Sequence, residues 1–482
     1  MASQSIDLLL INPLNRPNPP AYTPFGLLSI ATYLQENGYG VKILDRNASR
    51  EENNVRDYLK KYNPRAVGVS FFATGPLILD ALKIIKEVKS ELGKDIPIIC
   101  GGLYPTLFPK QVLMNNDVDI LVIGEGEITI LELMQQLQKP ESYRDIKGLI
   151  YKDKSGKIVE NPPRPLISDL NDLPMNDWSL IDIPKYLDRS YYAKKVIVTM
   201  TSRGCPYRCA FCWEPIFLKD KIKFRTISAK KVIEELTFLN SKYKIDGIHF
   251  FDDNFDADKK RLDEICKLMK TEHLDIRWQH SSRVIYATQD RLLMEKNSGC
   301  EIIEYGVESG SPRMLDFIKK DQTVSQITKA FSNCKEVKIR ANALIMIGMP
   351  TETIDDLKMT VNLIDSIPNL FTICNIYKPY PGSELFEYCI NNGRLKLPNT
   401  METMAETFGY TSTQLNMSEI EDKILSEVQE YFFKQNVIME AKDAIKRRDF
   451  GRLIKGVQKV PLKYTLKTLL HRKGAGTKPI WK

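Results

Sequence analysis

The fold is decided by residues 196–213, which read VIVTMTSRGCPYRCAFCW. The apolar start of this stretch predicts a buried strand. Cys205, Cys209 and Cys212 follow the strand with the spacing C-x3-C-x2-C. Three thiolates on one short loop can hold three irons of a [4Fe-4S] cluster and leave the fourth iron open for another ligand. The sequence therefore predicts a reactive iron–sulfur site at the carboxyl end of a strand.

Zinc is the alternative metal for such cysteines, but a structural zinc site needs four ligands. No fourth cysteine stands beside the loop, and the nearest histidine is His249. The remaining cysteines are scattered singly, which is not the pattern of a disulfide framework and indicates a reducing compartment. They are Cys100, Cys266, Cys300, Cys334, Cys374 and Cys389.

The chain has 482 residues, 43% of them hydrophobic and 27% charged, which is typical of a soluble protein of two or three domains. It opens without a secretory signal. No apolar stretch approaches the roughly 20 residues that span a bilayer. We therefore expect a cytoplasmic protein.

Residues 1–138 alternate predicted strands and helices. Five strands with intervening helices predict a doubly wound, Rossmann-like parallel sheet. Thr23 is the expected N-cap of the first helix, with Pro24 at its first position and Gly38 after its end. The expected strands are 8–13, 41–44, 66–70, 96–100 and 121–123, and the expected helices begin at 24, 54, 76 and 127.

Ligands of such sheets bind beyond the carboxyl ends of the strands. Small residues and glycines, which let a backbone approach a ligand closely, follow the last three strands. Turn geometry explains each glycine pair by itself, whereas three such loops on one edge favour a binding site. The candidate cofactor-binding residues of this edge are Ser70, Thr74, Gly101, Gly102, Gly124, Glu125 and Gly126.

Three further regions follow the sheet. Residues 139–190 read as a connector with a hairpin around 153–156. Residues 191–397 contain six strand–helix units, at 196–200, 247–251, 275–279, 302–307, 340–347 and 371–377, which predict a partial (β/α)6 barrel. Residues 398–482 read as mainly helical, with the clearest helix from Ile420 to Ala444.

The cysteine motif, with Phe211 before the last cysteine and Gly204 before the first, resembles that of the radical S-adenosylmethionine enzymes, specifically their cobalamin-binding class. The resemblance implies that S-adenosylmethionine chelates the open iron. It also implies that reductive cleavage gives a 5′-deoxyadenosyl radical, with the electron supplied by a reductase with flavodoxin or by a ferredoxin. The protein then positions its cofactors and excludes water.

Three barrel segments look like the family's S-adenosylmethionine contacts. They supply the candidate residues Asp252 and Asp253 after the second strand, Arg283 after the third, and Glu308 and Ser309 in the GVESGS segment after the fourth. The alternative for Asp252 and Asp253 is to cap the following helix. The alternative for Glu308 is a structural ion pair.

The N-terminal sheet is similar to the cobalamin-binding domain of the same enzymes, through Pro24-Phe-Gly, Gly101-Gly-Leu-Tyr-Pro-Thr106 and Gly124-Glu-Gly-Glu127. It departs from the wider cobalamin fold because the loop from Leu14 to Pro24 contains no histidine to ligate cobalt. This agrees with the radical class, where that ligand is often missing. A vestigial sheet that binds nothing is the alternative.

The leading functional hypothesis is C-methylation of an unactivated carbon in a small molecule or lipid. Oxidative cyclisation, ring rearrangement or carbon–carbon coupling without net methylation is the main alternative. Methylthiolation of RNA would require a second cluster from N-terminal cysteines, and only Cys100 precedes Cys205. A sensor that merely binds cobalamin or a cluster would not need the motifs after the fourth to sixth strands.

The C-terminal segment is basic. Thirteen Lys or Arg and two Asp lie between Lys442 and Lys482, and the net charge of the whole chain is +8. A solvated tail and a peripheral contact with an anionic membrane are both open, and the second would suit a lipid substrate. Nucleic acid is not expected, because aromatic residues are sparse there.

Overall fold

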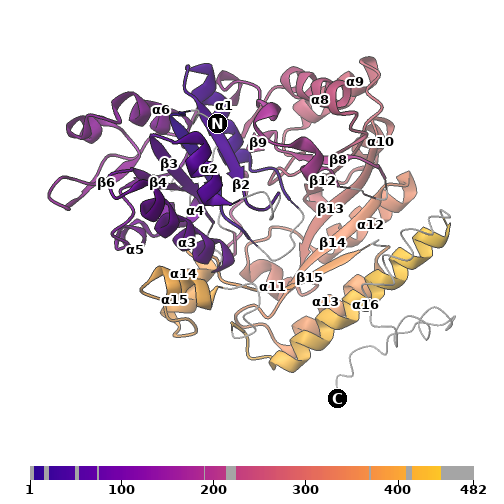
Figure 1. Ribbon diagram of the computed structural model, residues 1–482. Coiled ribbons are helices and arrows are strands. Elements are labelled where there is room, and N and C mark those ends of the chain that lie inside the picture. The colour runs from indigo at the N-terminus through magenta and orange to yellow at the C-terminus, as the bar shows by residue number, and fades with distance from the viewer. Residues whose placement is uncertain are drawn as a thin grey trace.

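The computed structural model describes residues 5–15, 21–48, 54–72, 75–188, 190, 192–212, 224–368, 371–408 and 415–446. Two mainly parallel sheets stand beside each other, each with helices packed against it (Figure 1). The predicted architecture, a Rossmann-like sheet followed by a partial barrel and helices, is confirmed.

The N-terminal sheet has the strand order β2-β1-β3-β4-β5-β6-β7. Its first five strands run parallel, and the predicted hairpin β6–β7 continues the sheet because β6 pairs antiparallel with β5. The strands are β1 (Leu8–Asn12), β2 (Val41–Asp45), β3 (Ala66–Ser70), β4 (Ile98–Gly101), β5 (Ile120–Val122), β6 (Leu149–Lys152) and β7 (Ile158–Glu160).

Helices cover both faces of this sheet. In β1, Leu8 and Leu10 belong to the core on the α1 side, while Leu9 and Ile11 belong to the core on the α3 side. A strand that is apolar on both faces is the expected signature of a parallel sheet. The helices are α1 (Phe25–Glu36), α2 (Val55–Tyr62), α3 (Gly75–Leu92), α4 (Leu103–Leu107), α5 (Pro109–Leu113) and α6 (Glu127–Gln136), followed by the 3-10 helices η1 (Pro140–Asp145), η2 (Leu170–Asp172), η3 (Trp178–Leu180) and η4 (Ile183–Tyr186).

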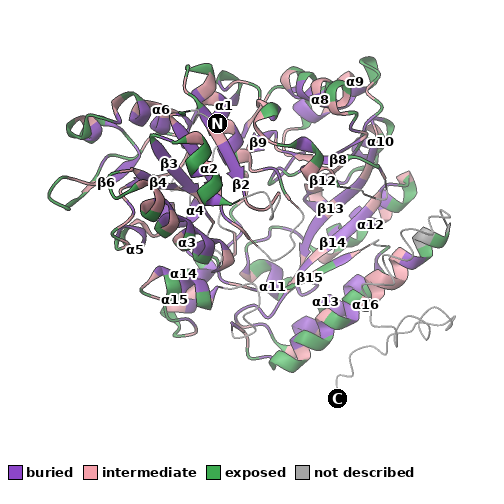
Figure 2. Cartoon of the chain, viewed as in Figure 1, coloured by how far each residue is buried: buried purple, intermediate pink, exposed green. Residues whose placement is uncertain are grey.

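The second sheet contains six parallel strands in the order β15-β14-β13-β12-β11-β8. Its strands are β8 (Val196–Thr199), β11 (Gly247–Phe250), β12 (Arg277–Ser282), β13 (Cys300–Glu308), β14 (Arg340–Ile347) and β15 (Thr372–Ile376), with a two-stranded ribbon of β9 (Ser202–Arg203) and β10 (Arg225–Thr226). Its helices are α8 (Ala229–Tyr243), α9 (Lys259–Thr271), η5 (Val284–Tyr286), α10 (Gln289–Asn297), α11 (Pro312–Phe317), α12 (Val324–Val337), α13 (Ile354–Ser366) and α14 (Glu384–Asn391). The strands are largely buried and the outward faces of the helices are exposed (Figure 2).

The predicted cap of α1 is wrong. The helix begins at Phe25, and Pro24 takes the cap position without a side-chain hydrogen bond. The Thr23 hydroxyl instead donates to the Val198 carbonyl of β8, at 3.2 Å. The loop before α1 is therefore fastened to the barrel, a long-range contact that local sequence does not reveal.

The helical C-terminal region divides between the two sheets. Helix α15 (Met401–Thr407) packs on α3, and α16 (Asp422–Lys446) lies along the edge strand β15 (Figure 1). The Asn436 side chain accepts from the Thr372 N–H at 2.9 Å and donates to the Thr372 carbonyl at 2.7 Å. This contact covers backbone groups that an edge strand leaves unpaired. Among the helices described, none has the length and apolarity that crossing a membrane requires.

Candidate active site

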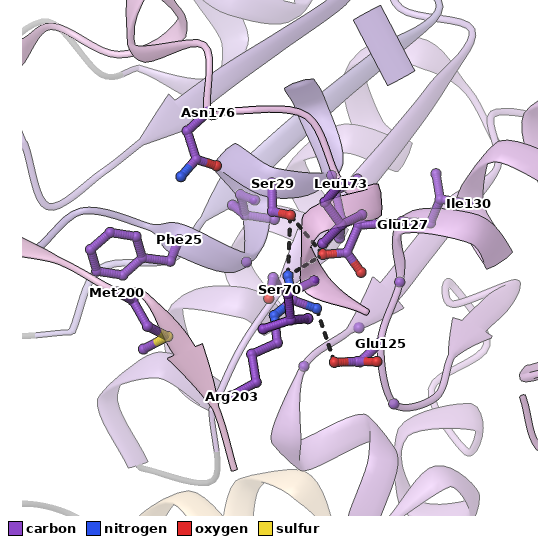
Figure 3. Close-up of a pocket in the computed structure, with 18 of the residues that line it drawn as sticks. Phe25, Ser29, Ser70, Glu125, Glu127, Ile130, Leu173, Asn176, Met200 and Arg203 are labelled. Carbon is purple, nitrogen blue, oxygen red and sulfur yellow. Dashed lines mark hydrogen bonds and ion pairs between the residues drawn. The ribbon is translucent and has the colours of Figure 1, made fainter. Parts of the chain in front are cut away.

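A cavity of about 710 Å³ lies where the carboxyl ends of the first sheet's strands face the barrel (Figure 3). Its inner wall is apolar and comes from the sheet and from α1 and α6, through Leu10, Ile30, Ile99, Val122 and Ile130. Its outer wall belongs to the barrel and includes Gly204 of the cysteine loop, Asp253 after β11 and Tyr380 after β15. One space therefore reaches both the sheet edge and the cluster loop.

Six of the seven sheet-edge residues predicted from sequence line this cavity together. They are Ser70, Gly101, Gly102, Gly124, Glu125 and Gly126, whereas Thr74 lies outside the described residues. Gly102 has a φ of 97°, and a Cβ there would meet the Phe71 carbonyl oxygen at 2.8 Å. Only glycine fits this turn, because a side chain would be strained and would also clash.

The cavity fits a large ligand with an apolar body and a polar rim, as the sheet-edge resemblance to cobalamin-binding domains predicts. A Cβ on Gly68 would stand 2.6 Å from Leu10, so the inner wall is built from glycine as well as from aliphatic residues. No histidine is among the described residues that line the cavity. This part of the chain therefore places no imidazole there to ligate cobalt.

Cys205, Cys209 and Cys212 lie on the loop after β9, and none of the three forms a disulfide. The loop is fastened at Ala210, directly after Cys209. The Ala210 N–H donates to the Ile318 carbonyl at 2.9 Å, and the Ala210 carbonyl accepts from the Leu385 N–H at 2.8 Å. Burial raises the pKa of the Cys205 thiol, although the Tyr207 N–H partly offsets this effect. The donor set fits a cluster held by three cysteines.

Arg283 lies directly against the cysteine loop. Its Nη1 donates to the Cys209 sulfur at 3.4 Å, and its Nη2 donates to the Lys320 carbonyl. The guanidinium also stacks over the Tyr207 ring, 3.8 Å from the ring centre. A buried cation beside a cysteine favours the thiolate, which is the form that binds iron. Arg283 is thus placed to stabilise a cluster ligand.

Replacing Arg283 by Gln should weaken retention of the cluster by about 10- to 100-fold, the usual loss when a partner of a metal ligand is removed. The rate of iron release to a chelator from the reconstituted protein measures this effect. Arg277→Gln is the matched control, since Arg277 begins β12, the strand that Arg283 follows, but pairs with Glu301 at the surface. Equal iron release from both variants would contradict the role assigned to Arg283.

The two aspartates after β11 have separate places. Asp252 is buried and accepts from the Thr201 N–H at 3.0 Å and from the Ser202 hydroxyl, so it braces the strand that leads into the cysteine loop. Burial raises the pKa of the Asp252 carboxyl. Helix α9 is capped by Asp258, so the capping alternative is wrong. Asp253 lines the cavity.

Glu308 ends β13 with a φ of 60°, a conformation that non-glycine residues adopt rarely and that often marks functional sites. Its carboxylate pairs with the buried Lys320 ammonium at 2.8 Å, which matches the alternative of a structural ion pair. The neighbouring Ser309 hydroxyl is hydrogen-bonded to Thr360 on α13 at 3.1 Å. Contacts of Glu308 and Ser309 with S-adenosylmethionine stay predictions.

The loop after β14 holds a second strained residue at the barrel mouth, Thr351, whose φ is 66°. Glu352 is buried and accepts from the N–H groups of Gly348 and Met349. Burial raises the pKa of this carboxyl to about 7, and the two backbone donors partly offset the rise. The side chain therefore shapes the loop that follows β14, the fifth strand of the barrel.

Three basic residues of the site were not predicted from the sequence: Lys320, which pairs with Glu308, and Arg203 and Arg225, which line the cavity. Arg203 stands two residues before Cys205, so its position carried a signal. Lys320 and Arg225 belong to no recognisable motif, and only the fold brings them to the site.

Comparison with known proteins agrees with this geometry. Residues 199–364 match the radical SAM superfamily, and residues 19–134 match the B12 binding domain. An uncharacterized methyltransferase of Pyrococcus horikoshii is 34% identical over 82% of this chain and 85% of its own. An anaerobic magnesium-protoporphyrin IX monomethyl ester cyclase of Rubrivivax gelatinosus is 27% identical over 77% of this chain and 66% of its own.

Solved structures share the fold. The radical S-adenosylmethionine methyltransferase TsrM from Kitasatospora setae, with cobalamin and a [4Fe-4S] cluster bound, has a TM-score of 0.66 and 20% identity, covering 81% of this chain and 75% of its own. The cobalamin-dependent S-adenosylmethionine radical enzyme OxsB, with aqua-cobalamin bound, has a TM-score of 0.67 and 18% identity. The match covers 92% of this chain and 69% of OxsB. At these identities the likeness concerns the fold alone.

The chain belongs to the cobalamin-binding radical S-adenosylmethionine enzymes. It is an enzyme of this class, with a [4Fe-4S] cluster, S-adenosylmethionine and cobalamin as its cofactors. The cysteine loop and the glycine-edged cavity are the two parts of the structure that fit these groups.

Proposed function

We propose that this enzyme transfers a methyl group from S-adenosylmethionine to an unactivated carbon of a small molecule or lipid. The observation that carries the proposal is that Gly102 of the sheet and Gly204 of the cluster loop line one cavity. When bound, the cluster with S-adenosylmethionine would supply a radical that abstracts a hydrogen atom from carbon, and cobalamin would supply a methyl carrier.

The protein's own residues supply position and environment. Cys205, Cys209 and Cys212 would hold the cluster, with Arg283 donating a hydrogen bond to the Cys209 sulfur. The glycine loops of the sheet edge let backbone N–H groups approach a large ligand, and the aliphatic inner wall keeps water away from it. Asp253, which lines the same cavity on the barrel side, would contact S-adenosylmethionine or substrate.

Relatives named as methyltransferases support methylation, namely the Pyrococcus horikoshii protein and a cytidylyl-2-hydroxyethylphosphonate methyltransferase of Streptomyces wedmorensis, which is 26% identical over 80% of this chain and 82% of its own. The relatives named as cyclases favour a second candidate, oxidative cyclisation without net methylation. Both reactions use the same cavity, so the geometry does not separate them.

Label transfer distinguishes the two reactions. The reconstituted enzyme is reduced with S-adenosylmethionine that carries a deuterated methyl group, in the presence of a small-molecule and lipid extract. Methylation predicts products that gain the labelled methyl, with more S-adenosylmethionine consumed than 5′-deoxyadenosine formed. Products that form without label would support cyclisation and contradict methylation.

We also propose a flavodoxin with its reductase, or a ferredoxin, as electron donor, because cleavage of S-adenosylmethionine needs a low-potential electron. The basic segment from Arg447 to Lys482 lies outside the described residues. Its composition supports a peripheral contact with an anionic membrane and hence a lipid substrate.

A further inference from the structure

Two glutamates of the sheet domain pair with two arginines of the barrel domain beside the cavity. Figure 3 shows three of these residues, Glu125, Glu127 and Arg203. Arg203 donates to Glu125 at 2.9 Å and to Glu127 at 2.6 Å. Arg225 donates to the other oxygen of Glu125, at 2.9 Å. Glu125 therefore joins two barrel arginines, one of which stands two residues before the first cluster cysteine, Cys205.

These glutamates and arginines also form hydrogen bonds with Ile167 and Ser29. Glu125 accepts from the Ile167 N–H at 2.7 Å, and Arg225 donates to the Ile167 carbonyl at 2.7 Å. The Ser29 hydroxyl donates to Glu127 at 2.7 Å and accepts from Arg203 at 3.2 Å. The connector and α1 are thus fastened at the same point as the two domains.

These four charged side chains are partly or fully buried, and the two positive charges match the two negative charges. The exposed fractions of the side chains are 26% for Arg203, 15% for Glu125, 8% for Arg225 and 3% for Glu127. Burial by itself raises the pKa of Glu125, but Arg225 and Arg203 outweigh it, so the pKa lies below its usual value. Charge-assisted bonds of this kind are short and directional. They fix an orientation better than apolar packing does.

We propose that Glu125 is a positioning residue that locks the glycine loop after β5 to the loop carrying the cluster cysteines. The glycines on either side of it, Gly124 and Gly126, line the cavity, as do Arg203 and Gly204 on the barrel side. The loops that would carry the two cofactors are therefore joined at one carboxylate. This inference rests on the proposed function, in which both cofactors act on one substrate.

A fixed separation matters because a displacement of about 1 Å in an active site can lower a rate by about a hundredfold. The Glu125 side chain is already committed to Arg203, Arg225 and Ile167. It acts through these groups, while its flanking backbone faces the cavity. The role differs from the cofactor contact that the sequence suggested for Glu125.

The test compares Glu125→Gln and Arg203→Lys with Asp119→Asn. Arg203→Lys keeps the positive charge but removes the planar guanidinium group, whose two Nη atoms reach two carboxylates. Asp119 is a matched control, since it pairs with Lys89 at 2.8 Å and accepts from the Ile98 N–H, but lies before β5 at the opposite end of the strand. Hydrogen exchange of backbone amides is measured on the full-length protein. In both test variants, the amides of peptides on both sides of the contact, around 124–128 and 201–206, should exchange roughly tenfold faster than in the parent.

A spectroscopic readout follows on the protein with both cofactors bound. Electron paramagnetic resonance detects the spin interaction between the reduced cluster and cob(II)alamin, which depends on their separation. The interaction should change in Glu125→Gln and Arg203→Lys, with iron and cobalt contents unchanged, and should be the same in Asp119→Asn as in the parent.

Three results would overturn the inference: faster exchange on the sheet side alone, an unchanged spin interaction, or loss of cobalamin from Glu125→Gln, which would mean direct cofactor binding. Failure of the proposed function is a separate outcome. In that case the exchange and spin results stand, but the parent enzyme transfers no labelled methyl group.

Discussion

Replacing Cys205 by Ala should abolish the formation of 5′-deoxyadenosine from S-adenosylmethionine. The loop would then offer two thiolates, and too few ligands would remain to hold a [4Fe-4S] cluster with one open iron. Removing a partner of a metal ligand typically lowers metal affinity or activity by about 10- to 100-fold. We therefore expect removal of the ligand itself to lower 5′-deoxyadenosine formation by more than about a hundredfold. Chromatography of the reduced reaction measures the nucleoside.

Cys374→Ala provides the control for this substitution. Cys374 is a free thiol of similar, intermediate exposure on β15, and it belongs to no other cysteine pattern. The control should keep its iron and its nucleoside formation. Activity surviving in Cys205→Ala, with the usual iron content, would show that the cluster is held elsewhere.

Replacing Gly26 by Phe should block cobalamin binding without unfolding the protein. Gly26 lies in the first turn of α1 and lines the cavity, and an added Cβ would have no atom within 4 Å. The phenyl ring therefore has room to enter the space that the ligand needs. We expect cobalamin affinity to fall at least about tenfold, since filling a preformed pocket removes contact area from the ligand.

Gly26→Ala separates this effect from changes in the helix. Alanine is favoured over glycine in a helix by about 1 kcal/mol. The free energy of unfolding of the Gly26→Ala variant should therefore not fall below that of the parent protein. Its methyl group is too small to fill the cavity, so affinity should stay near that of the parent. Titration of the protein with cobalamin gives both affinities. Equal binding by the Phe and Ala variants would place the cobalamin site away from this cavity.

Much of the fold followed from local patterns. The apolar runs from Leu8 and from Val196 predicted buried strands, and both are parallel strands covered by helices. Glycines after β4 and β5 predicted one sheet edge, and that edge lines the cavity. Such predictions succeed because strand periodicity and the position of strand ends are local properties, and topology then brings the ends together.

Long-range contacts were beyond the sequence. Thr23 resembled a helix cap, but its hydroxyl is bound by Val198 of the barrel. Glu125 resembled a ligand contact, and its carboxylate bridges Arg203 and Arg225. An ionised side chain pairs with an opposite charge that folding brings close to it. Sequence spacing does not identify such a partner when it lies about 80 to 100 residues away, as Arg203 and Arg225 do from Glu125.

The central claim is that one chain holds two cofactors at one cavity. The most direct test is elemental analysis of the anaerobically reconstituted protein after gel filtration with excess cobalamin. We predict about four irons and one cobalt per chain, as one [4Fe-4S] cluster and one cobalamin require. Full iron content with no cobalt at saturating cobalamin would contradict the account.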